Sequence, residues 1–85
     1  MNILKNKIEK AREKIEIGGI YYHYKDPNKK YIVLQIALLE NSQNVAIVYQ
    51  AEYGDKIIWI REIDNFLQVV EINGKKQQRF TLVNI

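Results

Sequence analysis

The spacing of apolar residues changes once along the chain, at Gly18 and Gly19, and this change limits the fold more than any other feature. Before the two glycines, apolar residues recur every three or four positions, which is the spacing of one face of an α-helix. After them, the spacing becomes two, which is typical of β-strands. The sequence therefore predicts an amphipathic helix over residues 2–16, followed by a mainly β domain. The apolar face of this helix consists of Leu4, Ile8, Ala11 and Ile15.

Short runs of β-forming residues fill the rest of the chain, and turn-forming residues separate them. Residues 62–66 form a further turn or a single helical turn. The pair Asn73-Gly74 is a strong hairpin signal, because both residues tolerate positive φ, and it predicts that residues 69–72 pair with residues 79–83. The expected strands cover residues 20–25, 31–39, 45–53, 57–61, 69–72 and 79–83. The expected turns are Asp26-Pro27-Asn28, Asn41-Ser42-Gln43-Asn44, Gly54-Asp55-Lys56 and Asn73-Gly74.

Five or six short strands without crossover helices favour a small antiparallel barrel. A chain of 85 residues has room for one such domain. We therefore divide the sequence into a helical extension over residues 1–17 and a β-barrel domain over residues 18–85. A helix of this length is marginal alone in water, so its apolar face must pack on the barrel or on a second copy of the chain.

The composition excludes several kinds of chemistry. The sequence has no cysteine and a single histidine, His23, so it offers no disulfide, no thiolate zinc site and no histidine cluster for a metal. No glycine-rich phosphate loop follows a strand, and the single serine, Ser42, lies far along the chain from His23. We expect a protein that is not an enzyme and has neither a catalytic residue nor a cofactor.

A pI near 9.2 suggests a nucleic-acid partner, but the charges are not concentrated as such a partner requires. Residues 1–16 hold five lysines and arginines against three glutamates, and residues 17–85 hold eight against seven acids. Most of the excess therefore lies on the predicted helix, interleaved with acids, while the β domain is close to neutral. Nucleic-acid binding through this helix and exposed tyrosines remains an alternative function.

Neither a membrane partner nor a signal peptide is expected. No run approaches the length of a membrane span, and the lysine-bearing N-terminus has neither an unbroken apolar stretch nor a cleavage site. We therefore expect a cytoplasmic protein. Isoleucine, asparagine and lysine dominate the sequence, which is typical of an AT-rich bacterial or phage genome.

Alternation along the third and fourth expected strands decides which aromatic residues share a face. If an odd number of loop residues joins the two strands, the numbers of opposed residues add to an even value. A shallow cup then forms, with aromatic walls and a guanidinium beside them. An even loop would instead turn Trp59 to the other face. The five residues of the cup are Tyr49, Ala51, Tyr53, Trp59 and Arg61.

This cup is compatible with two roles. Aromatic rings and a planar guanidinium suit a small planar or anionic ligand. Alternatively, Trp59 and the tyrosines form the core of a small barrel, and His23 is a structural histidine. The two arginines could instead form exposed ion pairs, Arg61 with Glu52, Glu62 or Asp64, and Arg79 with Glu71.

Several motifs resemble, in order and spacing, a small bacterial family catalogued as domain of unknown function 1653. The resemblance runs from about residue 18 to residue 83, implies an SH3-like barrel and implies no reaction. The sequence departs from the family pattern at Asp26, Gln50 and Glu62, and over Leu39-Glu40-Asn41-Ser42. The motifs are Gly19-Ile20-Tyr21-Tyr22-His23-Tyr24-Lys25, Tyr31, Val48-Tyr49, Ala51, Tyr53-Gly54-Asp55, Trp59-Ile60-Arg61, Phe66, Val70-Glu71-Ile72-Asn73-Gly74 and Arg79-Phe80.

The preferred hypothesis is a non-catalytic binding module for a small anionic or nucleotide-like ligand or a peptide. A second alternative, beside nucleic-acid binding, is a protein–protein or homodimer contact through residues 2–16. The positions that match the family pattern add candidates from the first and last strands, among them Tyr24. The candidate binding residues are Tyr21, His23, Lys25, Tyr49, Tyr53, Trp59, Arg61 and Arg79.

Overall fold

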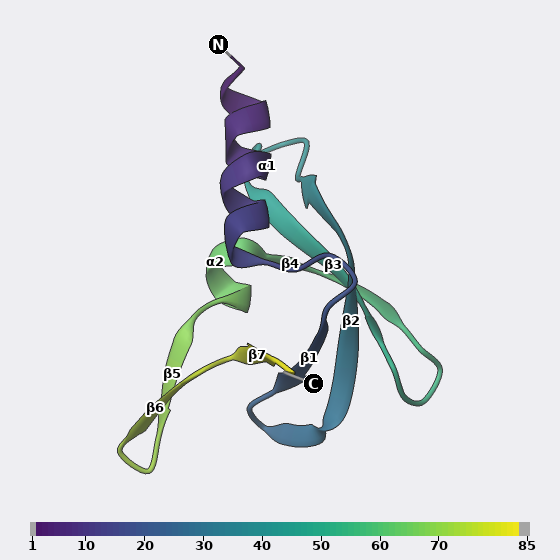
Figure 1. Cartoon of the computed structure of the whole chain (residues 1–85), viewed down its shortest axis with the longest axis vertical. Coiled ribbons are helices and arrows are strands. Elements are labelled where there is room, and N and C mark those ends of the chain that lie inside the picture. Colours follow the sequence, from purple (N-terminus) through teal and green to yellow (C-terminus); the bar gives the residue numbers. More distant parts are fainter. Residues whose placement is uncertain (1, 84–85) are drawn as a thin grey trace.

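The structure is a computed structural model that describes residues 2–83, and it is mainly β with one long helix (Figure 1). The helix α1 (Ile3–Lys14) leads into the first strand, and a single-turn helix α2 (Ile63–Phe66) follows the fourth. The strands are β1 (Ile20–His23), β2 (Asp26–Leu38), β3 (Val45–Ala51), β4 (Ile58–Glu62), β5 (Val69–Ile72), β6 (Lys75–Gln78) and β7 (Phe80–Leu82). The predicted N-terminal helix, mainly β architecture and helical turn near residue 63 are confirmed.

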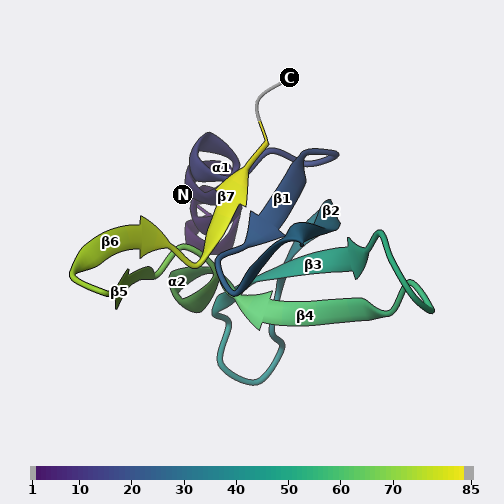
Figure 2. The same ribbon diagram turned by 90° about the horizontal axis from the view of Figure 1, so that it is seen from below.

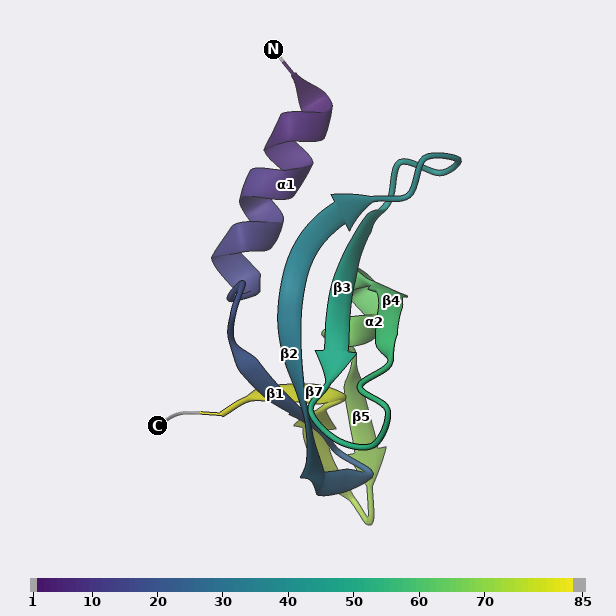
Figure 3. The ribbon, with the colours of Figure 1, turned by 90° about the vertical axis from the view of Figure 1, so that its right-hand side faces the viewer.

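Helix α1 begins at a capping residue and ends before the glycines. The Oδ1 atom of Asn2 accepts a hydrogen bond from the backbone N–H of Lys5 (3.1 Å), which satisfies one free donor of the first turn. The chain becomes extended at Ile15, and Gly18 then takes a left-handed conformation (φ +82°) that favours glycine. Ala11 and Ile15 are buried where α1 lies alongside β2 (Figure 3).

Five antiparallel strands form one sheet in the order β4-β3-β2-β1-β7, and β5 and β6 form a separate ribbon (Figure 2). Among residues 2–83, β4 and β7 are the edges of the sheet and do not pair with each other, so the sheet is open. The described part of the chain holds seven strands, where five or six were expected. The additional strand is β6.

The last predicted hairpin is wrong in its second strand. Asn73 (φ 52°) and Gly74 (φ 78°) do form the expected turn, but it joins β5 to β6. Strand β7 instead pairs with β1, where Phe80 lies opposite His23. Because the two-residue turn brings the residues directly after it back along β5, the polar stretch over β6 becomes the partner of β5.

A second correction concerns the turn predicted at Asp26-Pro27-Asn28. These residues belong to the start of β2, and the chain reverses at Tyr24 and Lys25. The proline does not prevent this, because Pro is tolerated near the beginning of a strand.

Strand β2 contains a bulge at Leu34. Val33 lies opposite Tyr49 and Gln35 lies opposite Val48, so β2 advances by two residues where β3 advances by one. A bulge of this kind bends the strand and increases its twist. Strand β2 curves visibly along its length (Figure 3), and one face of the sheet is therefore concave.

Aromatic rings dominate the core on this concave face. Phe66 from α2 stacks parallel on Phe80 from β7, with ring centroids 4.2 Å apart, and both rings are buried. Tyr21 and Tyr49 meet the edge of Phe66 in T-shaped contacts, with centroids 5.4 Å away in each case. Helix α2 therefore closes one end of the core, chiefly through Phe66 and with Ile63 packed beside it.

Candidate functional site

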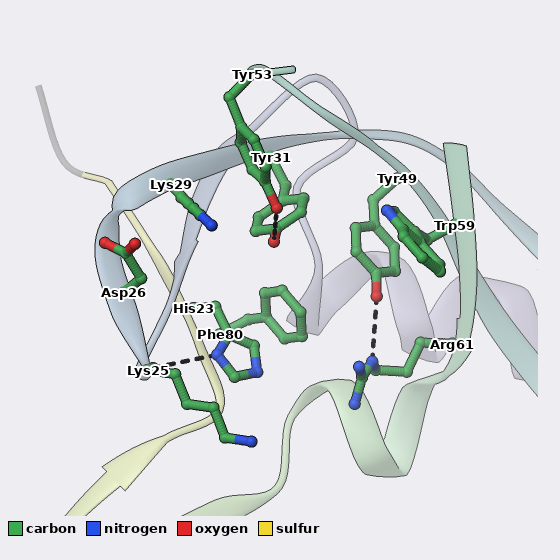
Figure 4. Close-up of a pocket in the computed structure, with 10 residues that line it drawn as sticks. All are labelled: His23, Lys25, Asp26, Lys29, Tyr31, Tyr49, Tyr53, Trp59, Arg61 and Phe80. Atoms are coloured by element: carbon green, nitrogen blue, oxygen red, sulfur yellow. Dashed lines mark hydrogen bonds between the residues drawn. The ribbon is translucent and has the colours of Figure 1, made fainter. Parts of the chain in front are cut away.

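The register of β3 and β4 places the predicted aromatic cup on one face. Tyr49 lies opposite Trp59, and Ile47 lies opposite Arg61, so the opposed numbers add to an even value as the cup requires. Tyr31 lies opposite Ala51 on the other side of β3 and so joins the same face. A pocket of about 310 Å³ opens there, which we call the basic aromatic pocket (Figure 4). Its lining residues are His23, Lys25, Asp26, Lys29, Tyr31, Tyr49, Tyr53, Trp59, Arg61 and Phe80.

Arg61 is held against the core by three contacts. Its Nε donates a hydrogen bond to the Tyr49 hydroxyl (3.1 Å), and one terminal nitrogen donates to the side-chain oxygen of Asn65 in α2. Its guanidinium carbon lies 5.4 Å from the centre of the Phe80 ring. No carboxylate within residues 2–83 lies in ion-pair range of this half-buried guanidinium. The positive charge is therefore positioned but not neutralised.

Two tyrosines form the opposite wall, Tyr31 from β2 and Tyr53 from the segment just after β3. The hydroxyl groups of Tyr31 and Tyr53 share a hydrogen bond of 2.5 Å, and their rings meet edge to face. Burial, reinforced by the bond to Tyr53, raises the pKa of Tyr31, so this phenol stays protonated at neutral pH. Since one hydroxyl donates the shared bond, the proton of the other is free to be donated to a bound group. The Nζ atom of Lys29 lies 5.2 Å from the centre of the Tyr53 ring.

His23 forms the base of the pocket beside Phe80. Its Nδ1 accepts a hydrogen bond from the backbone N–H of Lys25 (3.1 Å), which assigns the proton of the neutral ring to Nε2. Burial lowers the pKa of His23 below its ordinary value of 6.5, and the positive charges of Arg61, Arg79 and Lys25 lower it further. The ring is therefore neutral at pH 7, and the charged side chains that influence it are positive.

The charges around the pocket favour an anion. Three of its ten lining residues are cationic, Lys25, Lys29 and Arg61, and one, Asp26, is acidic. One carboxylate oxygen of Asp26 already accepts a hydrogen bond from the backbone N–H of Asn28 (3.1 Å). The pocket thus presents a net positive charge over a floor of aromatic rings.

Six of the eight sequence-predicted site residues line this pocket, and two do not. Tyr21 is buried in the aromatic core, and its hydroxyl accepts a hydrogen bond from the backbone N–H of Glu16 (3.0 Å). Arg79 donates to the side chain of Gln68 (2.9 Å) and lies over the ring of Tyr24, outside the pocket lining. It forms no ion pair with Glu71 within the described chain. Tyr21 is therefore part of the core, and Arg79 lies outside the lining of this pocket.

The alternative roles of the aromatic residues divide between core and surface. Tyr49 is buried and belongs to the core, although its hydroxyl reaches the pocket. Trp59 is 48% exposed and Tyr53 is 36% exposed, so neither is a core residue. The alternative in which Trp59 is a core residue is wrong, because β4 is an edge strand and leaves about half of this side chain exposed.

Sequence reasoning did not propose four of the lining residues, namely Asp26, Lys29, Tyr31 and Phe80. Tyr31 had a detectable signal, because it is part of the motif series and lies two residues from Val33 on an alternating strand. Asp26 and Lys29 were assigned to a turn and its flank. Phe80 lines the pocket because β7 pairs with β1, which the sequence did not predict.

Residues 2–83 contain neither a metal-ligand cluster nor a membrane-spanning helix. Within this range no three His, Cys, Asp or Glu side chains gather as a metal site would require. None of the helices over these residues has the length and apolar character needed to span a membrane.

Fold and pocket together define a small, mainly β domain with a basic aromatic pocket on the concave face of an open sheet. The chain belongs to the DUF1653 family, described as a protein of unknown function, whose sequence profile matches residues 19–82. This confirms the resemblance seen in the motifs. A crystal structure of a DUF1653 protein from Bordetella bronchiseptica is similar to 78% of this chain and 85% of that one, with 26% identity and a TM-score of 0.68. No curated protein matches the sequence.

Proposed function

We propose that this domain is a non-catalytic binding module whose basic aromatic pocket takes a small anionic ligand, such as a phosphate or carboxylate attached to a planar group. The observation that carries the proposal is Arg61, a half-buried guanidinium fixed by Tyr49 and Asn65 with no carboxylate partner in residues 2–83. A positioned guanidinium without a counter-charge is suited to bind an oxyanion through its remaining N–H groups.

The surrounding residues support the same class of ligand. Lys25 and Lys29 add positive charge at the rim, and the paired tyrosine hydroxyls offer a neutral donor. The exposed indole of Trp59 provides a flat surface on which a planar group could stack. A pocket of about 310 Å³ is at the small end of the range for ligand sites, which favours a mononucleotide or a peptide terminus over a larger ligand.

A titration followed by fluorescence tests the proposal, because Trp59 is the only tryptophan in the sequence and lines the pocket. The panel contains inorganic phosphate, a nucleoside monophosphate, and a short peptide with a free terminal carboxylate. A short single-stranded oligonucleotide represents the nucleic-acid alternative. We expect saturable binding of at least one of the three small anions. If phosphate, the nucleoside monophosphate and the peptide all give no response, the proposal is overturned.

Arg61→Met should weaken that binding by about tenfold or more, because a charge-assisted hydrogen bond contributes about 1.5–3 kcal/mol. Arg12→Met on the exposed surface of α1 is the matched control, since it removes the same charge away from the pocket. Lys25→Met, at an exposed position, is a second variant with little risk to folding. Equal affinity of wild type, Arg61→Met and Lys25→Met would place the ligand elsewhere. Steeply salt-dependent binding of the oligonucleotide that Arg12→Met weakens would favour the nucleic-acid function instead.

A further inference from the structure

Strand β4 leaves one side of its backbone without a partner. It forms an edge of the five-stranded sheet, and no strand within residues 2–83 pairs with its outer side. The backbone N–H of Ala51 donates to the carbonyl of Ile57 (3.0 Å), so the odd-numbered residues of β4 exchange hydrogen bonds with β3. The N–H and C=O of Ile60, and the corresponding groups of Ile58, therefore point away from the sheet.

The same edge carries a run of exposed apolar side chains. Ile57, Ile58, Trp59 and Ile60 are consecutive and exposed, and Ile60 reaches 63%. Open edges in natural proteins are usually blunted by charged side chains, a proline or a bulge. Strand β4 has no proline and no bulge, and its charged residues, Arg61 and Glu62, lie only at its C-terminal end. An exposed apolar edge of this kind is a template for pairing with another strand.

The side chains of β4 are complementary to themselves in one antiparallel register. Residues with outward backbone groups must face each other, so the numbers of opposed residues must add to an even value. A two-fold axis at Ile60 sets this residue against itself and places Trp59 of each copy opposite Arg61 of the other. Such opposed side chains are close enough for a guanidinium to lie against an indole ring, and the symmetry repeats this contact twice. A two-fold axis at Trp59 would instead place each Arg61 opposite Ile57, with no partner for its charge.

We propose that two copies of this chain pair through β4, antiparallel and centred on Ile60, to form one continuous sheet. The two-fold axis is perpendicular to the sheet, so both basic aromatic pockets open on the same face. Trp59 of each copy then borders the pocket of the other through its contact with Arg61. This interface goes beyond the proposed ligand site and does not depend on it.

Disulfide trapping tests the register, because the natural sequence has no cysteine. Two Ile60 positions facing each other across the axis have Cα atoms about 5.5 Å apart, which is within the range for a disulfide. We therefore expect Ile60→Cys to form a covalent dimer under mild oxidation. The matched control is Ile58→Cys, which is similarly exposed on the same strand but lies opposite Glu62 and should stay monomeric in a reducing-agent-free gel. Equal cross-linking of both variants, or of Ile58→Cys alone, would overturn the proposed register.

Molar mass in solution tests the interface itself. Sedimentation of the wild-type chain at about 1 µM to 1 mM should show a monomer–dimer equilibrium, a range that covers weak and moderate affinities. Ile60→Lys should shift it to the monomer with an unchanged circular dichroism spectrum, since a lysine protects an open edge. The matched control is Ile3→Lys on exposed α1. A wild-type monomer at every concentration would overturn the proposal and leave β4 to a strand of a different protein. A dimer lost in Ile3→Lys but kept in Ile60→Lys would assign the interface to the helix.

Discussion

Replacing Tyr49 by phenylalanine removes one hydroxyl from the junction between core and pocket. The ring stays buried, and what is lost is the acceptor of the 3.1 Å hydrogen bond from Arg61 Nε. A hydrogen bond to a charged group contributes about 1.5–3 kcal/mol to stability. Because this bond is only partly buried, water can replace some of it, and we expect Tyr49→Phe to cost about 1.5 kcal/mol. In a domain of this size, such a loss lowers the midpoint of thermal unfolding by roughly 6–12 °C.

The measurement is a double-mutant cycle with Arg61→Met, followed by urea and thermal unfolding. The two single losses should not add, and the coupling energy should be about 1.5 kcal/mol. Tyr31→Phe is the matched control, because it removes a hydroxyl that bonds only to the neutral hydroxyl of Tyr53, and it should cost about 0.5 kcal/mol. A coupling energy below about 0.3 kcal/mol, or equal losses in the two tyrosine variants, would refute the reasoning.

Two further predictions concern His23 and Phe66. Because burial and neighbouring cations lower the pKa of His23 in the folded state, the unfolded chain binds more protons just below pH 6.5. Stability should therefore be complete above pH 6.5 and decrease as the pH falls from there towards the folded-state pKa. Urea unfolding at a series of pH values should show that His23→Gln flattens the dependence of stability on pH. If the variant keeps the wild-type dependence, His23 is not its cause. Phe66→Ala should cost about 3–5 kcal/mol, because the ring is fully buried and stacked on Phe80, and Phe66→Leu should cost clearly less. Chemical denaturation measures both variants, and a loss below about 2 kcal/mol for Phe66→Ala would contradict the role of α2 in closing the core.

Local patterns predicted the part of the site that lies on adjacent strands. Tyr49, Trp59 and Arg61 could be placed on one face because the loop between β3 and β4 is short and side chains alternate strictly on each strand. The helix start at Asn2 and the turn at Asn73-Gly74 followed from side-chain chemistry that acts within a few residues. Such local features can be predicted because they depend on residues close together in the sequence and not on contacts with the rest of the chain.

Contacts between distant segments could not be predicted in the same way. Arg79 was placed in a hairpin with β5, but the polar residues of β6 occupy that position, and β7 pairs with β1 instead. Phe80 therefore reaches the pocket from a segment more than fifty residues from His23, and no local pattern records that proximity. The exposure of Trp59 could not be predicted from the sequence either, because it depends on β4 being the last strand of the sheet.

The bulge at Leu34 contributes to the shape of the pocket, whereas other residues provide its chemical groups. Val33 and Ile36 are three residues apart, so a regular strand would place them on opposite faces, but the residue inserted at Leu34 keeps both on the face of Tyr49 and Ile47. The bulge thus keeps the alternation of β2 in step with β3, and it also bends the strand. The groups that would hold a ligand lie on β1, β3, β4, their loops and the N-terminal part of β2, whereas the bulge that curves the sheet lies further along β2. A substitution or deletion near Leu34 can thus alter affinity by changing curvature, with every ligand-facing residue intact.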